Sequence, residues 1–165
     1  MITLENVLVA TDFGDASGTA LAYGRDLART FGARLHVLHV VDDVRARALG
    51  SEGYTVDLTD AQRAMEKSAR EQLDAIVLDD DRRELRANVV LRTSTTTALA
   101  IVSYAQDAKI DLIVMGTQGR GGLAHLFMGS VAERVVRTAP CPVLTVRHPE
   151  HEFIAPDALQ AVARS

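Results

Sequence analysis

Glycine is concentrated in one short stretch of this 165-residue chain, and a hydroxyl side chain follows the stretch. Five of the eleven glycines fall there, and Ser130 comes directly after the last of them; the five are Gly116, Gly119, Gly121, Gly122 and Gly129. Glycine lets backbone N–H groups approach an anion without a Cβ clash, and a helix that begins after such a loop adds favourable partial charge. The stretch therefore predicts a phosphate-binding loop. The Ser130 hydroxyl can cap the following helix or bind a phosphate oxygen or a metal, and these uses are compatible. A purely structural turn is the alternative interpretation of the stretch.

Two widespread phosphate-binding patterns do not fit the same stretch. A P-loop needs Lys and then Ser or Thr after its second glycine, whereas Gly129 is followed by Ser130 and Val131. The segment 119–124 matches the loose dinucleotide pattern, but no acidic residue stands about twenty positions further on at a strand end. The sequence thus argues against a P-loop and against a nicotinamide site.

The elements that must position this loop alternate between strand and helix. Short β-branched runs predict strands at 6–11, 34–41, 87–91, 112–115 and 143–146. Apolar residues recurring every three or four positions predict helices at 16–31, 59–76, 98–105 and 130–138. This alternation is typical of an α/β fold with a single open, doubly wound, five-stranded parallel sheet and helices on both faces. Ligands of such sheets bind at the carboxyl ends of the strands.

Some local features within this framework are also predicted. Thr59 is expected to cap its helix, and the inward face of that helix is expected to carry Ala61, Ala64, Met65, Ala69, Leu73 and Ile76. The segment 42–57 has no clear period and is expected to be a long connection. Asp79, Asp80 and Asp81 are followed by two arginines and are expected to form a solvated turn.

Composition and charge limit the classes of function. Hydrophobic residues make up 47% of the chain and charged residues 24%, which suits one packed domain. The formal charge is 18 − 22 = −4, so no basic surplus favours nucleic acid. No signal peptide and no apolar run of roughly 18 residues is present, which favours a cytoplasmic protein without membrane insertion. We expect a domain over 1–147 and a C-terminal tail over 148–165 that can include a short helix.

Several reactive side chains have a simpler interpretation than catalysis. His36 and His39 are three apart in a strand and point to opposite faces, so they cannot share a metal. His148 and His151 are separated by a proline, which argues against a helical zinc site. Cys141 has no partner thiol and is expected to be a packing residue. No catalytic residue and no protein-bound metal are predicted.

The spacing Gly116-x2-Gly119-x9-Gly129-Ser130 resembles that of the nucleotide-binding universal stress proteins. The segments Val9-Ala-Thr-Asp-Phe and Pro140-Cys-Pro-Val-Leu-Thr-Val are similar to that family too, and the resemblance covers 6–147. It implies a site for ATP, or for AMP or ADP, with Mg²⁺. The implied adenosine contacts are Asp12, with Ala10 and Thr11 before it, the Val40 backbone, and Gly116 at the ribose with Met115 beside it. The implied triphosphate contacts are Gly119, Arg120, Gly129, Ser130 and the Val131 amide.

The expected function is that of an ATP-binding regulator in the stress response. Its output would be a change of shape or of protein partner that depends on nucleotide, with hydrolysis slow or absent. The resemblance also implies a homodimer through the edge strand 143–146, and an exposed apolar edge favours the same pairing. Two alternatives stay open: an ATP-hydrolysing enzyme of the adenine-binding α/β folds, and a dimeric scaffold that binds no nucleotide.

Overall fold

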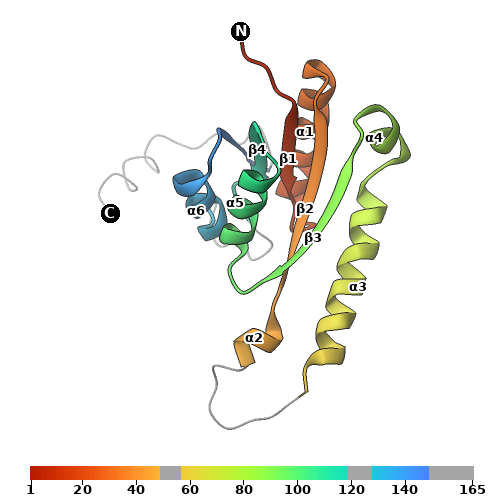
Figure 1. The fold of residues 1–165 in the computed structure, drawn as a ribbon, viewed down its shortest axis with the longest axis vertical. Coiled ribbons are helices and arrows are strands. Elements are labelled where there is room, and N and C mark those ends of the chain that lie inside the picture. Colours follow the sequence, from red (N-terminus) through yellow and green to blue (C-terminus); the bar gives the residue numbers. More distant parts are fainter. Residues whose placement is uncertain (49–56, 119–127, 149–165) are drawn as a thin grey trace.

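Five parallel strands form the centre of the computed structural model, which describes residues 1–48, 57–118 and 128–148 (Figure 1). The strands are β1 (Asn6–Ala10), β2 (Arg34–Asp42), β3 (Asn88–Ser94), β4 (Leu112–Gly116) and β5 (Val143–Val146). The helices are α1 (Asp15–Phe31), α2 (Val44–Ala48), α3 (Thr59–Ile76), α4 (Asp79–Glu84), α5 (Thr97–Asp107) and α6 (Ser130–Thr138). All neighbouring strands pair in parallel. The predicted doubly wound α/β sheet is confirmed.

The strand order is β3-β2-β1-β4-β5, so the chain moves outward from β1 in one direction and then resumes on its other side with β4. The carboxyl ends of β1 and β4 therefore mark the topological switch point of the sheet, where ligands of such folds bind. Thr11 N–H still donates to the Leu38 carbonyl at 2.9 Å, but β1 itself ends at Ala10. The first strand is thus one residue shorter than predicted.

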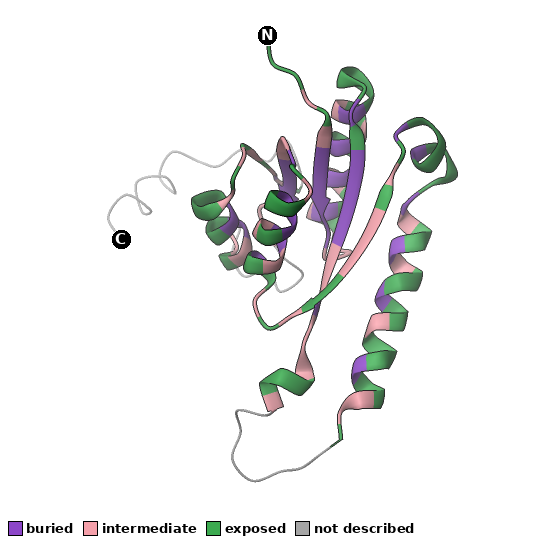
Figure 2. Ribbon diagram, in the orientation of Figure 1, coloured by how far each residue is buried: buried purple, intermediate pink, exposed green. Residues whose placement is uncertain are grey.

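Each face of the sheet has its own apolar core. Val7 and Val9 of β1 pack with α1 and α3 on one face, whereas Leu8 and Ala10 pack with α5 and α6 on the other. Because both faces are covered, the central strands are apolar at nearly every position, and Figure 2 shows β1 and the first half of β2 as buried. At the end of α1, Gly32 takes a left-handed conformation with φ 66°, which glycine adopts readily and which ends the helix.

The start of α3 differs from the prediction. Thr59 is the first helical residue and not the cap, and its N–H donates to the Asp57 carboxylate at 2.9 Å. Ala69 and Leu73 are buried as expected, but Ala61, Ala64 and Met65 are exposed. This half of α3 meets the end of the sheet through a polar contact, because the Thr93 hydroxyl of β3 donates to Glu66 at 2.8 Å.

The residue that is buried in this part of α3 is Gln62, which is 1% exposed. Its amide oxygen accepts the Val44 N–H at 3.0 Å, and its amide nitrogen donates to Glu66 at 3.0 Å. Gln62 therefore attaches α2 to α3. The expected long connection 42–57 thus contains the helix α2, and its residues 49–56 lie outside the described part of the chain.

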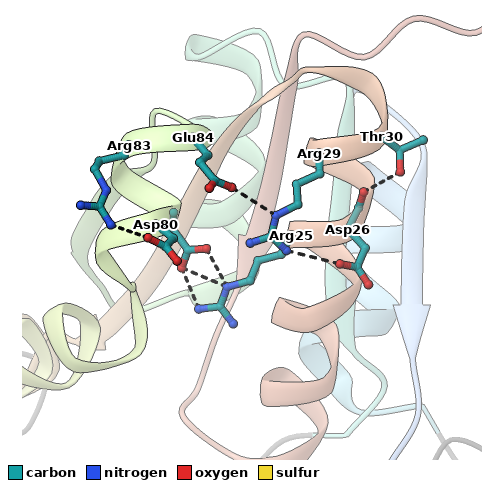
Figure 3. Close-up of polar contacts among 8 residues, drawn as sticks. Arg25, Asp26, Arg29, Thr30, Asp80, Arg83 and Glu84 are labelled. Atoms are coloured by element: carbon teal, nitrogen blue, oxygen red, sulfur yellow. Dashed lines mark hydrogen bonds and ion pairs between the residues drawn. The ribbon is translucent and has the colours of Figure 1, made fainter.

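The expectation of a solvated turn at Asp79–Asp81 is wrong, because these residues begin α4 and Asp81 is fully buried. Nε of Arg25 lies 2.9 Å from both carboxylate oxygens of Asp81, and a terminal guanidinium nitrogen of Arg25 lies 2.8 Å from Oδ2. Figure 3 shows the arginines of α1 reaching the acidic groups of α4. A buried carboxylate is stable in this place because a partner from a distant helix neutralises it.

Helix length and hydropathy leave no membrane-spanning candidate among the described helices. The predicted tail lies outside the described residues from position 149 onward.

Candidate functional site

A cavity of about 460 Å³ opens at the carboxyl ends of β1, β2 and β4. This is the switch point of the sheet, and the volume falls in the range of about 300 to 1,000 Å³ that is usual for small-molecule sites. The starts of α1, α5 and α6 complete its wall through Ser17, Thr97 and Ser130. The fold thus brings together segments from both ends of the chain at one place.

Nine of the eleven predicted site residues line this cavity: Ala10, Thr11, Asp12, Val40, Met115, Gly116, Gly129, Ser130 and Val131. The other two, Gly119 and Arg120, lie outside the described residues, as do Gly121 and Gly122. The structure therefore supports the grouping of the nine residues, while their roles toward a ligand stay predictions.

The loop from β1 to α1 is shaped by Asp12. Its Oδ1 accepts the Gly14 N–H at 3.0 Å and the Ser17 hydroxyl at 2.8 Å. Phe13, which lies between Asp12 and Gly14 in the sequence, has a φ of 64°, which bulky residues rarely adopt. Asp12 thus orders the loop, as a turn aspartate does, and also lines the cavity.

The rings of His39 and Phe13 brace this loop, with their centroids 4.3 Å apart. Nδ1 of His39 lies 2.8 Å from the Thr11 carbonyl oxygen. Because a carbonyl can only accept, Nδ1 carries the proton of this bond. His36 bonds instead with Tyr104 of α5, so the two histidines serve opposite faces of the sheet, as predicted.

The backbone of Val40 presents a donor and an acceptor to the cavity. In a parallel ladder both polar groups of a residue face the same neighbouring strand, and alternate residues face opposite neighbours. The Leu38 carbonyl bonds with Thr11 on the β1 side, so the N–H and C=O of Val40 face that side too. Since β1 has ended by then, these two groups lie beside the cavity that Val40 lines. Such a pair can recognise the edge of a planar heterocycle.

The start of α6 supplies backbone donors on the opposite side of the cavity. The first intrahelical bond runs from the Glu133 N–H to the Gly129 carbonyl at 3.0 Å, so the N–H groups of Ser130, Val131 and Ala132 have no helical acceptor. All three residues line the cavity. The helix start therefore offers three N–H groups and positive partial charge.

The structure shows how Ser130 and Gly129 are used at this helix start. Ser130 is the first helical residue and does not cap the helix, because Gly129 occupies the cap position and no side chain makes a cap bond there. The N–H of Gly129, a residue that the resemblance places at the triphosphate, donates to the Thr117 carbonyl at 2.6 Å. The capacity to bind an anion lies in the first turn of α6 and not in the Gly129 amide.

Gly116 has a packing reason to be glycine. A Cβ at this position would lie 2.8 Å from Cβ of Ala16 and 3.1 Å from N of Ser17. Any side chain would therefore push the start of α1 away from the end of β4. The predicted contact between Gly116 and a ribose is compatible with this packing role, since Gly116 also lines the cavity.

Several lining residues are not among those predicted from the sequence, notably Ser17, Leu38, Thr97 and Ile101. Leu38 alternates with Val40 along β2, so the strand period could have indicated it. Thr97 and Ile101 line the cavity because α5 packs beside α6, and no local pattern encodes that neighbourhood.

The described residues contain no cluster of three or more His, Cys, Asp or Glu side chains that could hold a metal ion, and His151 lies outside them. Cys141 is partly buried against the core that α5 and α6 share, and burial raises the pKa of its thiol. A raised pKa disfavours the nucleophilic thiolate, in agreement with a packing role.

Comparison with known proteins gives a consistent family. Residues 3–147 match the model of the universal stress protein family. A universal stress protein of Thermus aquaticus is 36% identical over 143 residues, which cover 87% of this chain and 98% of that protein. One from Methanocaldococcus jannaschii is 31% identical over 148 residues, which cover 90% of this chain and 85% of that protein.

Solved structures show the same architecture. A universal stress protein family member from Burkholderia pseudomallei has a TM-score of 0.64 at 31% identity, covering 87% of this chain and 96% of that one. The universal stress protein of Archaeoglobus fulgidus, solved in complex with dAMP, has a TM-score of 0.58 at 24% identity, covering 88% and 98%. The second likeness concerns the fold alone.

Proposed function

The chain belongs to the universal stress protein family, and on that premise we propose that it binds an adenine nucleotide in the cavity at the carboxyl ends of β1, β2 and β4. The observation that carries the proposal is the pairing of two features within this cavity. The Val40 backbone offers a donor and an acceptor on one side, and the start of α6 offers N–H groups on the other. The proposed ligand is ATP, with ADP and AMP as shorter ligands of the same site.

The base would lie at the Val40 end. Leu38, Ile101 and Met115 give this part of the cavity an apolar wall, which suits a planar aromatic ring. Adenine carries an amino donor beside a ring-nitrogen acceptor, and these match the Val40 carbonyl and N–H respectively. Guanine carries the opposite pattern at the same edge, so the backbone favours adenine.

The phosphates would lie against the first turn of α6. The N–H groups of Ser130 and Val131, the Ser130 hydroxyl and the helix partial charge all favour an anion there. We retain Gly119, Arg120 and Gly129 in the proposed site. The N–H of Gly129 is bonded to Thr117, so Gly129 would contribute by allowing the phosphates to approach the start of α6 closely. Mg²⁺ would offset phosphate charge when bound, held by phosphate oxygens and the Ser130 hydroxyl, since the described residues supply no acidic cluster.

The proposed role is regulatory binding in the cytoplasm during the stress response. Asp12 and His39 are the ionisable residues among the described lining residues, and both hold the β1–α1 loop through Oδ1 and Nδ1. Neither is arranged as a general base, which favours slow or absent hydrolysis. A nucleotide then acts by stabilising the conformation that it binds best, and so alters which protein partner is bound.

A homodimer through β5 is the second part of the proposal. Within the described part of the chain, this strand pairs with β4 on one side only, and its other edge is proposed to pair with a second copy. Leu144, 36% exposed, adds apolar surface at that edge.

Thermal unfolding with added ATP, ADP, AMP or adenosine, with and without Mg²⁺, tests nucleotide binding. Ligand at about 100 times its dissociation constant should stabilise the fold by roughly 2.7 kcal/mol. GTP at the same concentrations is the matched ligand control and should stabilise less. The absence of a shift with every adenine ligand would favour the scaffold without nucleotide, and multiple-turnover phosphate release would favour the enzyme.

A pair of variants on α6 locates the phosphates. Ser130→Ala should weaken ATP and AMP binding and leave adenosine binding unchanged. Thr138→Ala removes a hydroxyl from the far end of the same helix, where it donates to the Arg134 carbonyl at 2.7 Å, and should change neither. Equal ATP affinity in all three proteins would contradict the proposed place of the phosphates.

A further inference from the structure

Ser17 is a buried hydroxyl that touches three partners at the cavity wall. It lies in the first turn of α1 and is 3% exposed. Its Oγ lies 2.8 Å from Oδ1 of Asp12, 3.0 Å from the Gly14 carbonyl oxygen and 3.1 Å from Oγ1 of Thr11. All three contacts connect the first turn of α1 to the end of β1 and the β1–α1 loop.

The directions of these bonds follow from the number of protons. Thr11 Oγ1 accepts the Phe13 N–H at 3.0 Å, so its own proton is available to Ser17. Ser17 has one proton, and the Asp12 carboxylate is both the shortest and the charged acceptor. The order of donation is therefore Thr11 to Ser17 to Asp12.

The frame that holds Ser17 is rigid. Its backbone packs against Gly116 at the end of β4, where even one added methyl group would lie 3.1 Å from the Ser17 nitrogen. The hydroxyl thus links the Asp12 carboxylate to a helix that is packed against the sheet. The loop that carries Asp12 also contains Phe13, whose φ is positive. The Gly14 N–H is a second donor to the same oxygen, Oδ1.

We propose that Ser17 is a positioning residue, whose hydroxyl holds the Asp12 carboxylate in the orientation that receives the nucleoside part of the ligand. The inference rests on the proposed nucleotide site and assigns it a residue that acts through Asp12. Removal of the hydroxyl should weaken every ligand that contains the nucleoside, whatever its number of phosphates.

The test is a set of calorimetric titrations with adenosine, AMP and ATP. Ser17→Ala should weaken all three by the same factor, roughly three- to tenfold, the usual worth of one hydrogen bond. In an Asp12→Ala background the same Ser17→Ala change should cause no further loss, because the two side chains act as one unit. Thr30→Ala, which removes a hydroxyl from the exposed far end of α1, is the control and should change no affinity.

The outcomes separate this inference from the nucleotide site itself. If the wild-type protein binds none of the three ligands, both proposals are wrong. If the wild type binds but Ser17→Ala keeps full adenosine affinity, or loses as much in the Asp12→Ala background, Ser17 does not position Asp12. Should Ser17→Ala fail to fold, Ser17→Cys fills the site with a slightly larger side chain that is a weaker donor, and the same comparisons then decide.

Discussion

Gly24 and Val9 are in such close contact that a methyl group on Gly24 would lie 2.3 Å from Cγ2 of Val9. Val9 is fully buried at the centre of β1, so it cannot yield without disturbing the sheet. This contact sets the distance between α1 and β1. It thereby also fixes the position of the first turn of α1, which includes Ser17, relative to the carboxyl ends of the strands.

Gly24→Ala is therefore expected to destabilise the fold by about 1 to 3 kcal/mol through overpacking, although alanine is the better helix former. Gly18 is the matched control on the same helix, since a Cβ there meets no atom within 4 Å. Gly18→Ala should stabilise by about 0.5 to 1 kcal/mol. Urea unfolding of both variants measures the difference. If both variants changed the free energy of unfolding by the same amount in the same direction, the close contact between Gly24 and Val9 would be contradicted.

The buried pair of Arg25 and Asp81 gives a second prediction about stability. Asp81→Ala leaves the Arg25 guanidinium without its partner between α1 and α4, and it should cost about 3 to 5 kcal/mol. Asp80→Ala removes the neighbouring, exposed carboxylate that pairs with Arg83, and it should cost at most about 1 kcal/mol. Chemical denaturation of the two variants distinguishes these roles, and a mild Asp81→Ala variant would show that the pair is dispensable.

The sequence was sufficient for the sheet and for the parts of the site that follow strands. Asp12 and Gly116 come directly after or at the end of apolar runs, and parallel strands bring such ends to one edge. Asp81 was misjudged because its partner is 56 positions away, on α1, and no local pattern indicates that pairing. The exposure of Ala61, Ala64 and Met65 at the start of α3 could not be predicted for a related reason, since helical periodicity indicates an apolar face but not which of its residues are covered.

The network around His36 predicts how stability depends on pH. Its Nδ1 lies 2.8 Å from the Tyr104 hydroxyl and its Nε2 lies 3.2 Å from Oδ1 of Asn6. Asn88 donates to the Tyr104 oxygen, so the phenol proton goes to Nδ1 and the ring donates from Nε2. Both ring nitrogens are then satisfied in the neutral form. Burial, and to a lesser extent the charge of Arg34, lowers the pKa of His36 from 6.5 to about 4.

Because the unfolded chain binds this proton more readily, stability should be complete above pH 6.5 and fall as the pH drops toward about 4. The full loss is up to about 3 kcal/mol for such a shift. His36→Gln, which cannot take up a proton, should flatten the dependence in this window. Unfolding free energies measured at several pH values test this, and an equally steep slope in the variant would assign the loss to other groups.

The open edge of β5 allows a selective test of the proposed dimer. The carbonyls of Pro142 and Val146 bond toward β4, so Thr145, at an odd position between them, directs its N–H to the open edge. Thr145→Pro removes that outward donor without removing a hydrogen bond to β4, and it should convert a dimer to a monomer in analytical ultracentrifugation. Thr145→Val keeps the N–H and should leave the dimer intact. A dimer that persists in Thr145→Pro would place the interface elsewhere.

The adenine site itself is tested most directly by following backbone amides of the ¹⁵N-labelled protein by NMR as AMP is added. We expect saturable shifts at one AMP per chain, largest at Val40, Ser130 and Val131, with Asn88 and His36 at the opposite ends of the strands unaffected. Saturable binding that leaves the amides of Val40 and Ser130 unchanged would contradict the account.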